Sequence, residues 1–282
     1  MCYYSTVTWP ALVVGLLAYP LFSLVETSFY NVRLVAGGVS KEFVGLYNYI
    51  RVFSDPLFIY SIEITLVFTI VSVIIEILLG IILALAVANS KFKRLWISIL
   101  MISMIIPPLS VALIWRFMAY PEMGLLDQLT SFIGIGKIPW LSDSFWARIL
   151  IIIVDVWHWT AFCFLIIYAG YVSLPLILYE AAMVDGASRL QTFKEITLPL
   201  LKPTILVAAF FRTIDILQAF PEIWQLTFGG PQSATTILNI LAYLATFEFM
   251  DWGYASIVAL TLMLITALFV LMFNLLLRRR AE

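Results

Sequence analysis

Charged residues are scarce in this chain of 282 residues. Lys, Arg, Asp and Glu together make up 12% of it, whereas 63% of the residues are hydrophobic. Soluble globular proteins carry about 25% charged residues, so this composition excludes a well-hydrated soluble domain and places the chain in a lipid bilayer. The formal net charge is −1, which lacks the basic excess of a nucleic-acid-binding face. No nucleic-acid partner is therefore expected.

Cysteine and basic N-terminal residues are also nearly missing. The two cysteines, Cys2 and Cys163, are isolated, which supports neither a disulfide framework nor a zinc site. We expect no metal and no covalent cofactor in this chain. Met1–Thr8 contains no Lys or Arg, so a cleaved secretory signal, which needs a basic start, is not expected. The first apolar run is therefore predicted to remain as a membrane span.

Long apolar runs dominate what is present. About 20 apolar helical residues cross a bilayer core of about 30 Å. Six runs reach that length: Trp9–Phe29, Ile62–Ala88, Leu95–Phe117, Ile149–Val172, Thr204–Phe220 and Gly253–Leu277. The apolar stretch Thr235–Met250 is predicted to be interfacial or re-entrant. The predicted fold is all-α, a polytopic membrane protein of about six transmembrane helices. It forms a single domain over residues 1–282, with its core at residues 60–277.

Basic residues in short loops indicate the orientation, because cytoplasmic loops are enriched in Lys and Arg. Three basic segments fall on one side of a six-span chain: Lys91–Arg94, Arg189–Lys202 and Arg278–Arg280. This side is predicted to be the cytoplasm, which puts both termini there and the chain in the cell (inner) membrane. The two long outer loops, Tyr30–Ser61 and Met118–Arg148, are rich in aromatic residues. These favour a membrane-interface belt, with a docking surface for an outside partner as the alternative.

The cytoplasmic loop between spans four and five, Leu174–Pro203, is predicted to form two short helices rather than an irregular connection. Pro175 suits the first turn of a helix, and Gly186 can take a positive φ, so a sharp turn is expected there. A second short helix over Ser188–Thr197 would end at Pro199 and Pro203. The loop is either an amphipathic connector on the bilayer or a contact surface for another protein, which small alanines would let approach closely.

Motifs in this loop resemble a known family. Glu180-Ala181-Ala182, Gly186, Ile196 and Leu198-Pro199 resemble the EAA signature of binding-protein-dependent ABC importer permeases. The maltose-type sugar permeases are similar in more positions, and the resemblance covers nearly the whole chain. The additional matching stretches are Asp185-Gly186-Ala187, Phe193, Leu198-Pro199-Leu200, Val44–Tyr49 with Asp55-Pro56, Trp140–Asp143, Gly229-Gly230-Pro231 and Asp251–Ala255.

The resemblance implies a division of labour. The EAA loop would be the coupling helix that seats in a groove of a cytoplasmic ATPase, with Glu180 and Gly186 carrying the contact and Ala181, Ala182, Asp185 and Ala187 beside them. The implied partners are a second permease subunit, two copies of the ABC ATPase and an extracytoplasmic sugar-binding protein. The chain itself lacks the G-x-x-x-x-G-K-[ST] phosphate loop, so ATP and Mg are expected on the partner subunits and this chain is not expected to be an enzyme.

Polar residues within the spans are the candidates for the substrate pathway, since charges in hydrocarbon are costly. Arg212 and Asp215 share a helix face, and Asp215, Gln218 and Glu222 continue it as a stripe with spacings of three and seven. This pattern indicates either an internal ion pair or a polar wall of the path. Glu76, deep in the second span, favours a hydrogen bond to a neighbouring helix over a ligand role.

A second set lies in span four. Asp155 and His158 share a face, with Trp159 close by. They could bind sugar hydroxyls and the apolar side of a sugar ring, or they could be structural hydrogen-bond partners. Asn239 and Tyr243, four residues apart, are further candidates for the cavity.

Other classes of function compete with a sugar importer. A permease of the same mechanism could carry a phosphorylated polyol or another solute. An ion-coupled secondary transporter would account for the intramembrane charges, but it would not need an EAA loop, and no inverted repeat is evident. An intramembrane enzyme would need paired catalytic groups, for which His158 with Asp155 is the single weak candidate.

Overall fold

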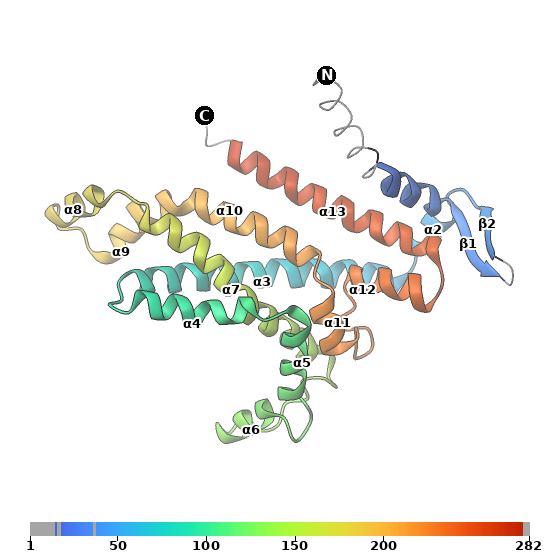
Figure 1. The fold of residues 1–282 in the computed structure, drawn as a ribbon, viewed down its shortest axis with the longest axis horizontal. Helices are drawn as coiled ribbons and strands as arrows, with labels where there is room; N and C mark the ends of the chain where they lie inside the picture. The colour runs from blue at the N-terminus through green and yellow to red at the C-terminus, as the bar shows by residue number, and fades with distance from the viewer. Residues whose placement is uncertain (1–14, 16–17, 36–37, 279–282) are drawn as a thin grey trace, which may run out of the picture. The chain divides into compact units, whose positions relative to one another are not determined.

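Helices make up most of the chain in the computed structural model, which describes residues 15, 18–35 and 38–278 (Figure 1). Residues 18–28 are helical. The elements that follow are β1 (Tyr30–Val35), β2 (Gly38–Phe43), α2 (Tyr47–Phe53), α3 (Pro56–Ala88), α4 (Lys93–Ile105), α5 (Pro108–Met118), α6 (Leu125–Phe132), α7 (Ser144–Val172), α8 (Leu176–Val184), α9 (Arg189–Thr192), the π-helix η1 (Phe193–Thr197), α10 (Leu198–Leu217), α11 (Pro221–Thr227), α12 (Leu238–Tyr243), the π-helix η2 (Leu244–Glu248) and α13 (Trp252–Arg278).

Two units divide the chain, residues 1–63 with 236–265 and residues 64–235 with 266–282. Several predictions fall outside the described residues: the start of the first span at Trp9, Cys2, the Met1–Thr8 segment and the basic residues at 279–280. The single-domain prediction for residues 1–282 stays a prediction.

The all-α membrane fold is confirmed, while the number of spans stays a prediction. Within the described residues, three helices are long and apolar enough to cross a membrane: α3, α7 and α13. A fourth span results if the bent pair α4 and α5 is counted as one. Helix α10 is 20 residues long but contains Lys202, Arg212 and Asp215.

The predicted span Leu95–Phe117 is broken in its middle rather than continuous. The chain bends by 92° between α4 and α5, because Pro107 and Pro108 have no N–H to continue the helical ladder and force the preceding residue out of the helical region. Ile106 is accordingly extended, with ψ 130°. Its carbonyl therefore lies outside the hydrogen-bond ladders of both helices.

The predicted end of the second loop helix at Pro199 and Pro203 is also wrong. Pro199 lies in the first turn of α10, where a missing N–H costs little, and Pro203 lies inside that helix. The π-helix η1 precedes it, and the N–H of Leu198 donates to the Phe193 carbonyl. Helix α10, which corresponds to the predicted fifth span, therefore begins six residues before the predicted Thr204 and ends at Leu217 rather than Phe220.

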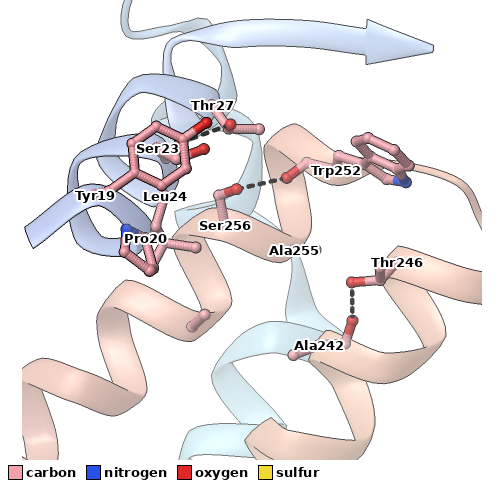
Figure 2. Close-up of a pocket in the computed structure, with 11 residues that line it drawn as sticks. Tyr19, Pro20, Ser23, Leu24, Thr27, Ala242, Thr246, Trp252, Ala255 and Ser256 are labelled. Carbon is pink, nitrogen blue, oxygen red and sulfur yellow. Dashed lines mark hydrogen bonds between the residues drawn. The ribbon is translucent and has the colours of Figure 1, made fainter. Parts of the chain in front are cut away.

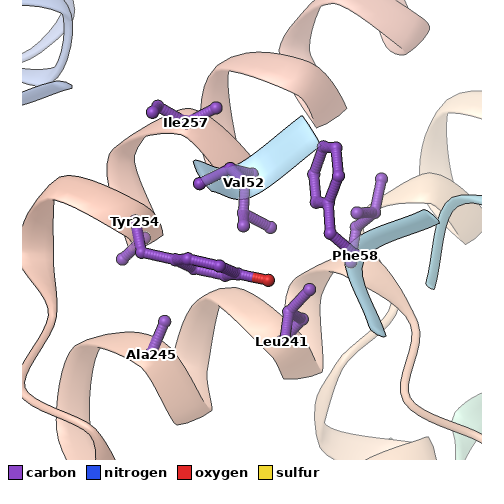
Figure 3. Packing of buried hydrophobic residues seen from close by; sticks show 9 residues of the cluster. Val52, Phe58, Leu241, Ala245, Tyr254 and Ile257 are labelled. Carbon is purple, nitrogen blue, oxygen red and sulfur yellow. The ribbon is translucent and has the colours of Figure 1, made fainter. Parts of the chain in front are cut away.

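The predicted outer loop Tyr30–Ser61 holds the main departure from an all-helical chain. Strands β1 and β2 form an antiparallel hairpin in which Tyr30 pairs with Phe43, and α2 follows it. In the same unit, side chains of α2, α3, α12, η2 and α13 converge on an apolar core (Figure 3). Its fully buried members include Val52, Phe58 and Val258.

Two of the family-like stretches meet beside this core. The Asn48 amide donates to the carbonyls of Ser28 and Tyr30, at 3.1 and 3.0 Å. A Cβ at Gly253 would lie 2.6 Å from Asn48 Nδ2, so only glycine fits there. Arg51 pairs with Asp251, and the Tyr254 hydroxyl donates to Asp55 at 2.7 Å. The Val44–Tyr49 and Asp251–Ala255 stretches therefore pack together and have a structural role in this unit.

In the other unit, α7 packs against α4 and α10. Glycines allow close approach: a Cβ at Gly170 of α7 would lie 2.6 Å from Thr204 of α10. A buried apolar cluster that includes Ala84, Phe164 and Leu201 fills the contact between α3, α7 and α10. This packing places α8 and α9 at one end of α7 and α10, and α5 and α6 at the opposite end (Figure 1).

Candidate functional site

The loop that resembles the EAA signature forms two short helices around a glycine. Helix α8 ends in a Schellman motif, in which the N–H of Ala187 donates to the Ala182 carbonyl at 2.9 Å and the N–H of Gly186 to the Met183 carbonyl at 3.2 Å. Gly186 has φ +72°, as this motif requires. The predicted sharp turn at Gly186 is confirmed. Helix α9 then starts with a capping box made by Ser188 and Gln191.

The loop presents an exposed surface that combines the signature residues with apolar side chains. Glu180, Ala181, Asp185 and Gly186 are exposed, whereas Ala182 is buried and Ala187 is half-buried. Exposed apolar side chains flank them at Leu176, Ile177, Met183, Val184 and Leu190. Tyr179 connects α8 to the end of the π-helix η1 through a 3.1 Å hydrogen bond to Thr197. An exposed apolar surface on an ordered element is typical of a protein or membrane contact.

A cluster of charged side chains lies between α3, α7 and α10, and Arg212 is at its centre. The Nε of Arg212 donates to Glu76 Oε2 at 2.7 Å, and its Nη2 donates to Glu76 Oε1 at 3.1 Å and Asp155 Oδ1 at 2.6 Å. The Nη1 donates to Asp215 Oδ2 at 2.7 Å. The predicted Arg212–Asp215 ion pair is confirmed, and so is the predicted hydrogen bond between Glu76 and a neighbouring helix, in which Glu76 accepts from Arg212 of α10.

Exposure differs sharply within this cluster. The side chains of Arg212, Glu76 and Asp155 are at most 4% exposed, whereas that of Asp215 is 52% exposed. The ring of Trp159, which is half-buried, covers the guanidinium, with Arg212 Cζ 5.2 Å from the ring centroid. The structure therefore brings Asp155, Trp159 and Asp215 together around a cation that the sequence analysis had linked to Asp215 alone.

His158 belongs to a separate pair. Its Nε2 donates to the Ile106 carbonyl at 3.1 Å, because that oxygen can only accept. Its Nδ1 lies within hydrogen-bond distance of Glu222 Oε2, at 3.2 Å, and both side chains are buried. The imidazole thus connects α7 to the bend between α4 and α5 and to α11. The sequence analysis did not predict the contact between His158 and the bend. The Pro107-Pro108 pair inside an apolar run indicates that the helix breaks there.

The predicted polar stripe through Asp215, Gln218 and Glu222 is wrong as a helical stripe. Helix α10 ends at Leu217, and Glu222 belongs to α11, so the spacing of seven residues no longer places the side chains on one face. Asp215 and Gln218 are exposed, whereas Glu222 is buried against His158. Aromatic residues Phe220 and Trp224, which stack with a ring-centroid distance of 6.1 Å, lie on either side of Glu222 in sequence.

Asn239 and Tyr243 lie on α12, in the other unit, and both are half-buried. Their role in lining a pathway stays a prediction. In the same unit a pocket of about 490 Å³ lies between residues 19–27, α12, η2 and α13 (Figure 2). The hydroxyls of Thr246 and Ser256 donate to carbonyls of their own helices. The pocket walls are therefore mostly apolar.

Comparison with known proteins fits this arrangement. Residues 76–282 match the family model described as binding-protein-dependent transport system inner membrane component. The chain is 37% identical to the sulfoquinovosyl glycerol transport system permease protein SmoG of Agrobacterium fabrum over 251 residues, which cover 88% of this chain and 80% of SmoG. It is 39% identical to the trehalose/maltose transport system permease protein MalF of Thermococcus litoralis over 222 residues, which cover 78% and 75% of the two chains.

A solved structure supports the fold. The chain resembles a bacterial ABC transporter involved in the import of the acidic polysaccharide alginate, with a TM-score of 0.83, 23% identity and coverage of 99% of this chain and 96% of that one. At this identity the likeness concerns the fold alone. Since the family model covers well over half of the sequence, the chain belongs to the family of binding-protein-dependent transport system inner membrane components.

Proposed function

We propose that this chain is the permease subunit of an ATP-binding-cassette importer and forms half of the translocation pathway for a sugar or oligosaccharide. The observation that carries the proposal is the exposed, ordered α8–α9 loop with the EAA-like residues at one end of the membrane helices. The relatives named for sulfoquinovosyl glycerol and for trehalose/maltose transport support a carbohydrate substrate.

The α8–α9 loop would be the point at which ATP hydrolysis acts on this chain. Glu180, Ala181, Asp185 and Gly186 are accessible to a partner, and the exposed apolar residues beside them would become buried in a groove of a cytoplasmic ATPase. Burial of apolar surface stabilises such a contact. Two ATPase copies, which would bind ATP and Mg, and a second permease subunit would complete the complex. An extracytoplasmic binding protein would deliver the sugar.

The α8–α9 loop also sets the proposed orientation. If α8 meets a cytoplasmic ATPase, then α5 and α6, at the opposite end of α7, face the outside. Lys91, Arg94 and Arg189 fall on the same side as α8, in agreement with the enrichment of basic residues in cytoplasmic loops. We further propose that both termini lie in the cytoplasm, as the distribution of basic residues along the sequence predicts.

The pathway itself would be lined by polar groups of α7 and α10. The carboxylate of Asp215 supplies hydrogen-bond acceptors and Gln218 supplies an amide, and both groups can bind sugar hydroxyls. The ring of Trp159 supplies an aromatic face, which can pack on the apolar side of a sugar ring. Asp155, His158 and Glu222 are buried in ion pairs and hydrogen bonds, and they would position the lining residues.

The test is sugar-stimulated ATP hydrolysis by the complete complex in lipid nanodiscs, with the loaded binding protein and a panel of sugars. Gly186→Pro is the test variant, because proline cannot adopt the positive φ of Gly186 and lacks the N–H that donates to Met183. Gly134→Pro is the matched control: Gly134 also has a positive φ (+81°) and open space around it, but it follows α6 at the opposite end of α7.

We expect one or more sugars to stimulate hydrolysis, and we expect the Gly186 variant but not the Gly134 variant to lose that stimulation. If no ATPase co-purifies, and transport instead follows an ion gradient and is unaffected at Gly186, the chain acts as a secondary transporter and the proposal fails.

A further inference from the structure

The guanidinium of Arg212 has almost no capacity left for an anionic ligand. A guanidinium carries five N–H donors, and the three nitrogens of Arg212 already make four hydrogen bonds, all to carboxylate oxygens. The Trp159 ring covers the group. An incoming carboxylate or sulfonate would therefore have to displace a carboxylate of the protein itself to reach this cation.

The number of charged groups in the cluster also argues against binding of an anionic ligand. One guanidinium contacts three carboxyl groups, those of Glu76, Asp155 and Asp215. Carboxyl groups thus outnumber the guanidinium three to one, and all four hydrogen bonds of the guanidinium go to them. Helix α3 contains no Lys or Arg that could change this balance.

The part of the cluster that a solute can reach is acidic. Asp215 is half-exposed, whereas Arg212 is 1% exposed, and the neighbouring accessible groups are the amide of Gln218 and the ring of Trp159. A sugar hydroxyl can donate to a carboxylate in a strong, charge-assisted hydrogen bond. A second negative charge at the same place would be repelled, and more strongly in a membrane interior than in water.

We propose that the Arg212 cluster selects uncharged, hydroxyl-rich solutes and rejects solutes that carry a carboxylate or sulfonate. The inference rests on the proposed function, because it takes the exposed side of Asp215 to line the pathway. Neither the fold nor membership of the family decides this property, since the alginate transporter of the same fold is described as importing an acidic polysaccharide and SmoG, which is 37% identical, is named for sulfoquinovosyl glycerol, a sulfonated sugar. Selectivity against acidic sugars is thus assigned to particular side chains of this chain.

The experiment measures direct binding, so that the preference of the binding protein does not enter. The purified complex in nanodiscs, without binding protein, is titrated with maltose, lactose and cellobiose and with the corresponding aldonic acids, with saturation-transfer NMR as the readout. Wild type is compared with Asp215→Asn, which keeps the shape and removes one charge. Glu248→Gln removes one charge from an exposed position on η2, in the other unit, and serves as the control.

We expect at least one neutral sugar to bind about tenfold or more tightly than its aldonic acid, since juxtaposed like charges cost several kcal/mol and 1.4 kcal/mol is already tenfold. Asp215→Asn should reduce this ratio severalfold, and Glu248→Gln should leave it unchanged. A normal melting temperature of the Asp215 variant ensures that the change is local.

Two outcomes overturn the inference while the proposed function stands. One is that an acidic sugar binds as tightly as its neutral counterpart. The other is that no sugar binds directly although the loaded binding protein still stimulates ATP hydrolysis. If there is neither binding nor stimulation, the proposed function fails and the selectivity inference fails with it.

Discussion

A side chain placed at Gly186 should uncouple the α8–α9 loop without unfolding the protein. Gly186 has φ +72°, and an added Cβ would have nothing within 4 Å. The penalty is therefore backbone strain alone, about 1–2 kcal/mol for an ordinary L-residue in the left-handed region. Asn tolerates this region better than other non-glycine residues. Gly186→Val and Gly186→Asn thus form a pair that differs in backbone preference.

The strain can be relieved by opening the end of α8. The two hydrogen bonds of the Schellman motif, Ala187 to Ala182 and Gly186 to Met183, would then be lost to water. A change of about 1–2 kcal/mol shifts such a local equilibrium by a factor of about 5–30. Since the turn is exposed, the melting temperature of the whole chain should change little.

The assay is the ATPase activity of the complete complex with and without the loaded binding protein. For Gly186→Val we expect the stimulation of ATP hydrolysis to fall about fivefold or more, because valine is strained at a positive φ. Gly186→Asn should stay within about twofold of wild type, because asparagine tolerates a positive φ. Full stimulation in the Val variant, or equal loss in both variants, would refute the conclusion that the left-handed turn positions the coupling surface.

Three further substitutions test the packing by thermal unfolding of the purified protein. Arg212→Met leaves buried carboxylates without a counter-charge, and it should destabilise the chain by about 3–5 kcal/mol; an unchanged melting temperature would contradict the central role of this ion cluster. Gly253→Ala places a methyl group against the Asn48 amide and should cost about 1–3 kcal/mol, with a less than additive effect in the double variant with Asn48→Ala. His158→Phe removes the donor to the Ile106 carbonyl and should cost about 1–3 kcal/mol, so a neutral effect would show that this hydrogen bond is dispensable.

Local features of the fold could be predicted from the sequence because their causes are local. The apolar runs of α3, α7 and α13 are long enough to specify membrane helices by themselves. The turn at Gly186 follows from the residue that tolerates a positive φ directly after a short apolar helix. The same reasoning paired Arg212 with Asp215, three residues apart on one helix.

Features that depend on packing could not be predicted in this way. Glu76 and Arg212 are separated by 136 positions, and no periodicity within one helix indicates which distant carboxylate a buried guanidinium meets. The bend after Ile106 was missed for another reason: hydropathy measures apolar content, but it does not register that Pro107 and Pro108 lack N–H donors. The break after Leu217 likewise separates Glu222 from a stripe that spacing alone suggested.

The bend between α4 and α5 is held by a side chain from another helix. His158 of α7 donates to the Ile106 carbonyl, so an imidazole supplies the hydrogen bond that a peptide N–H supplies in an unbroken helix. On α5, the Nη1 of Arg116 donates to the Gln225 carbonyl of α11 at 2.9 Å. The bend is therefore a fixed corner rather than a hinge, and any motion of α5 that straightened it would first have to detach it from α7 and α11.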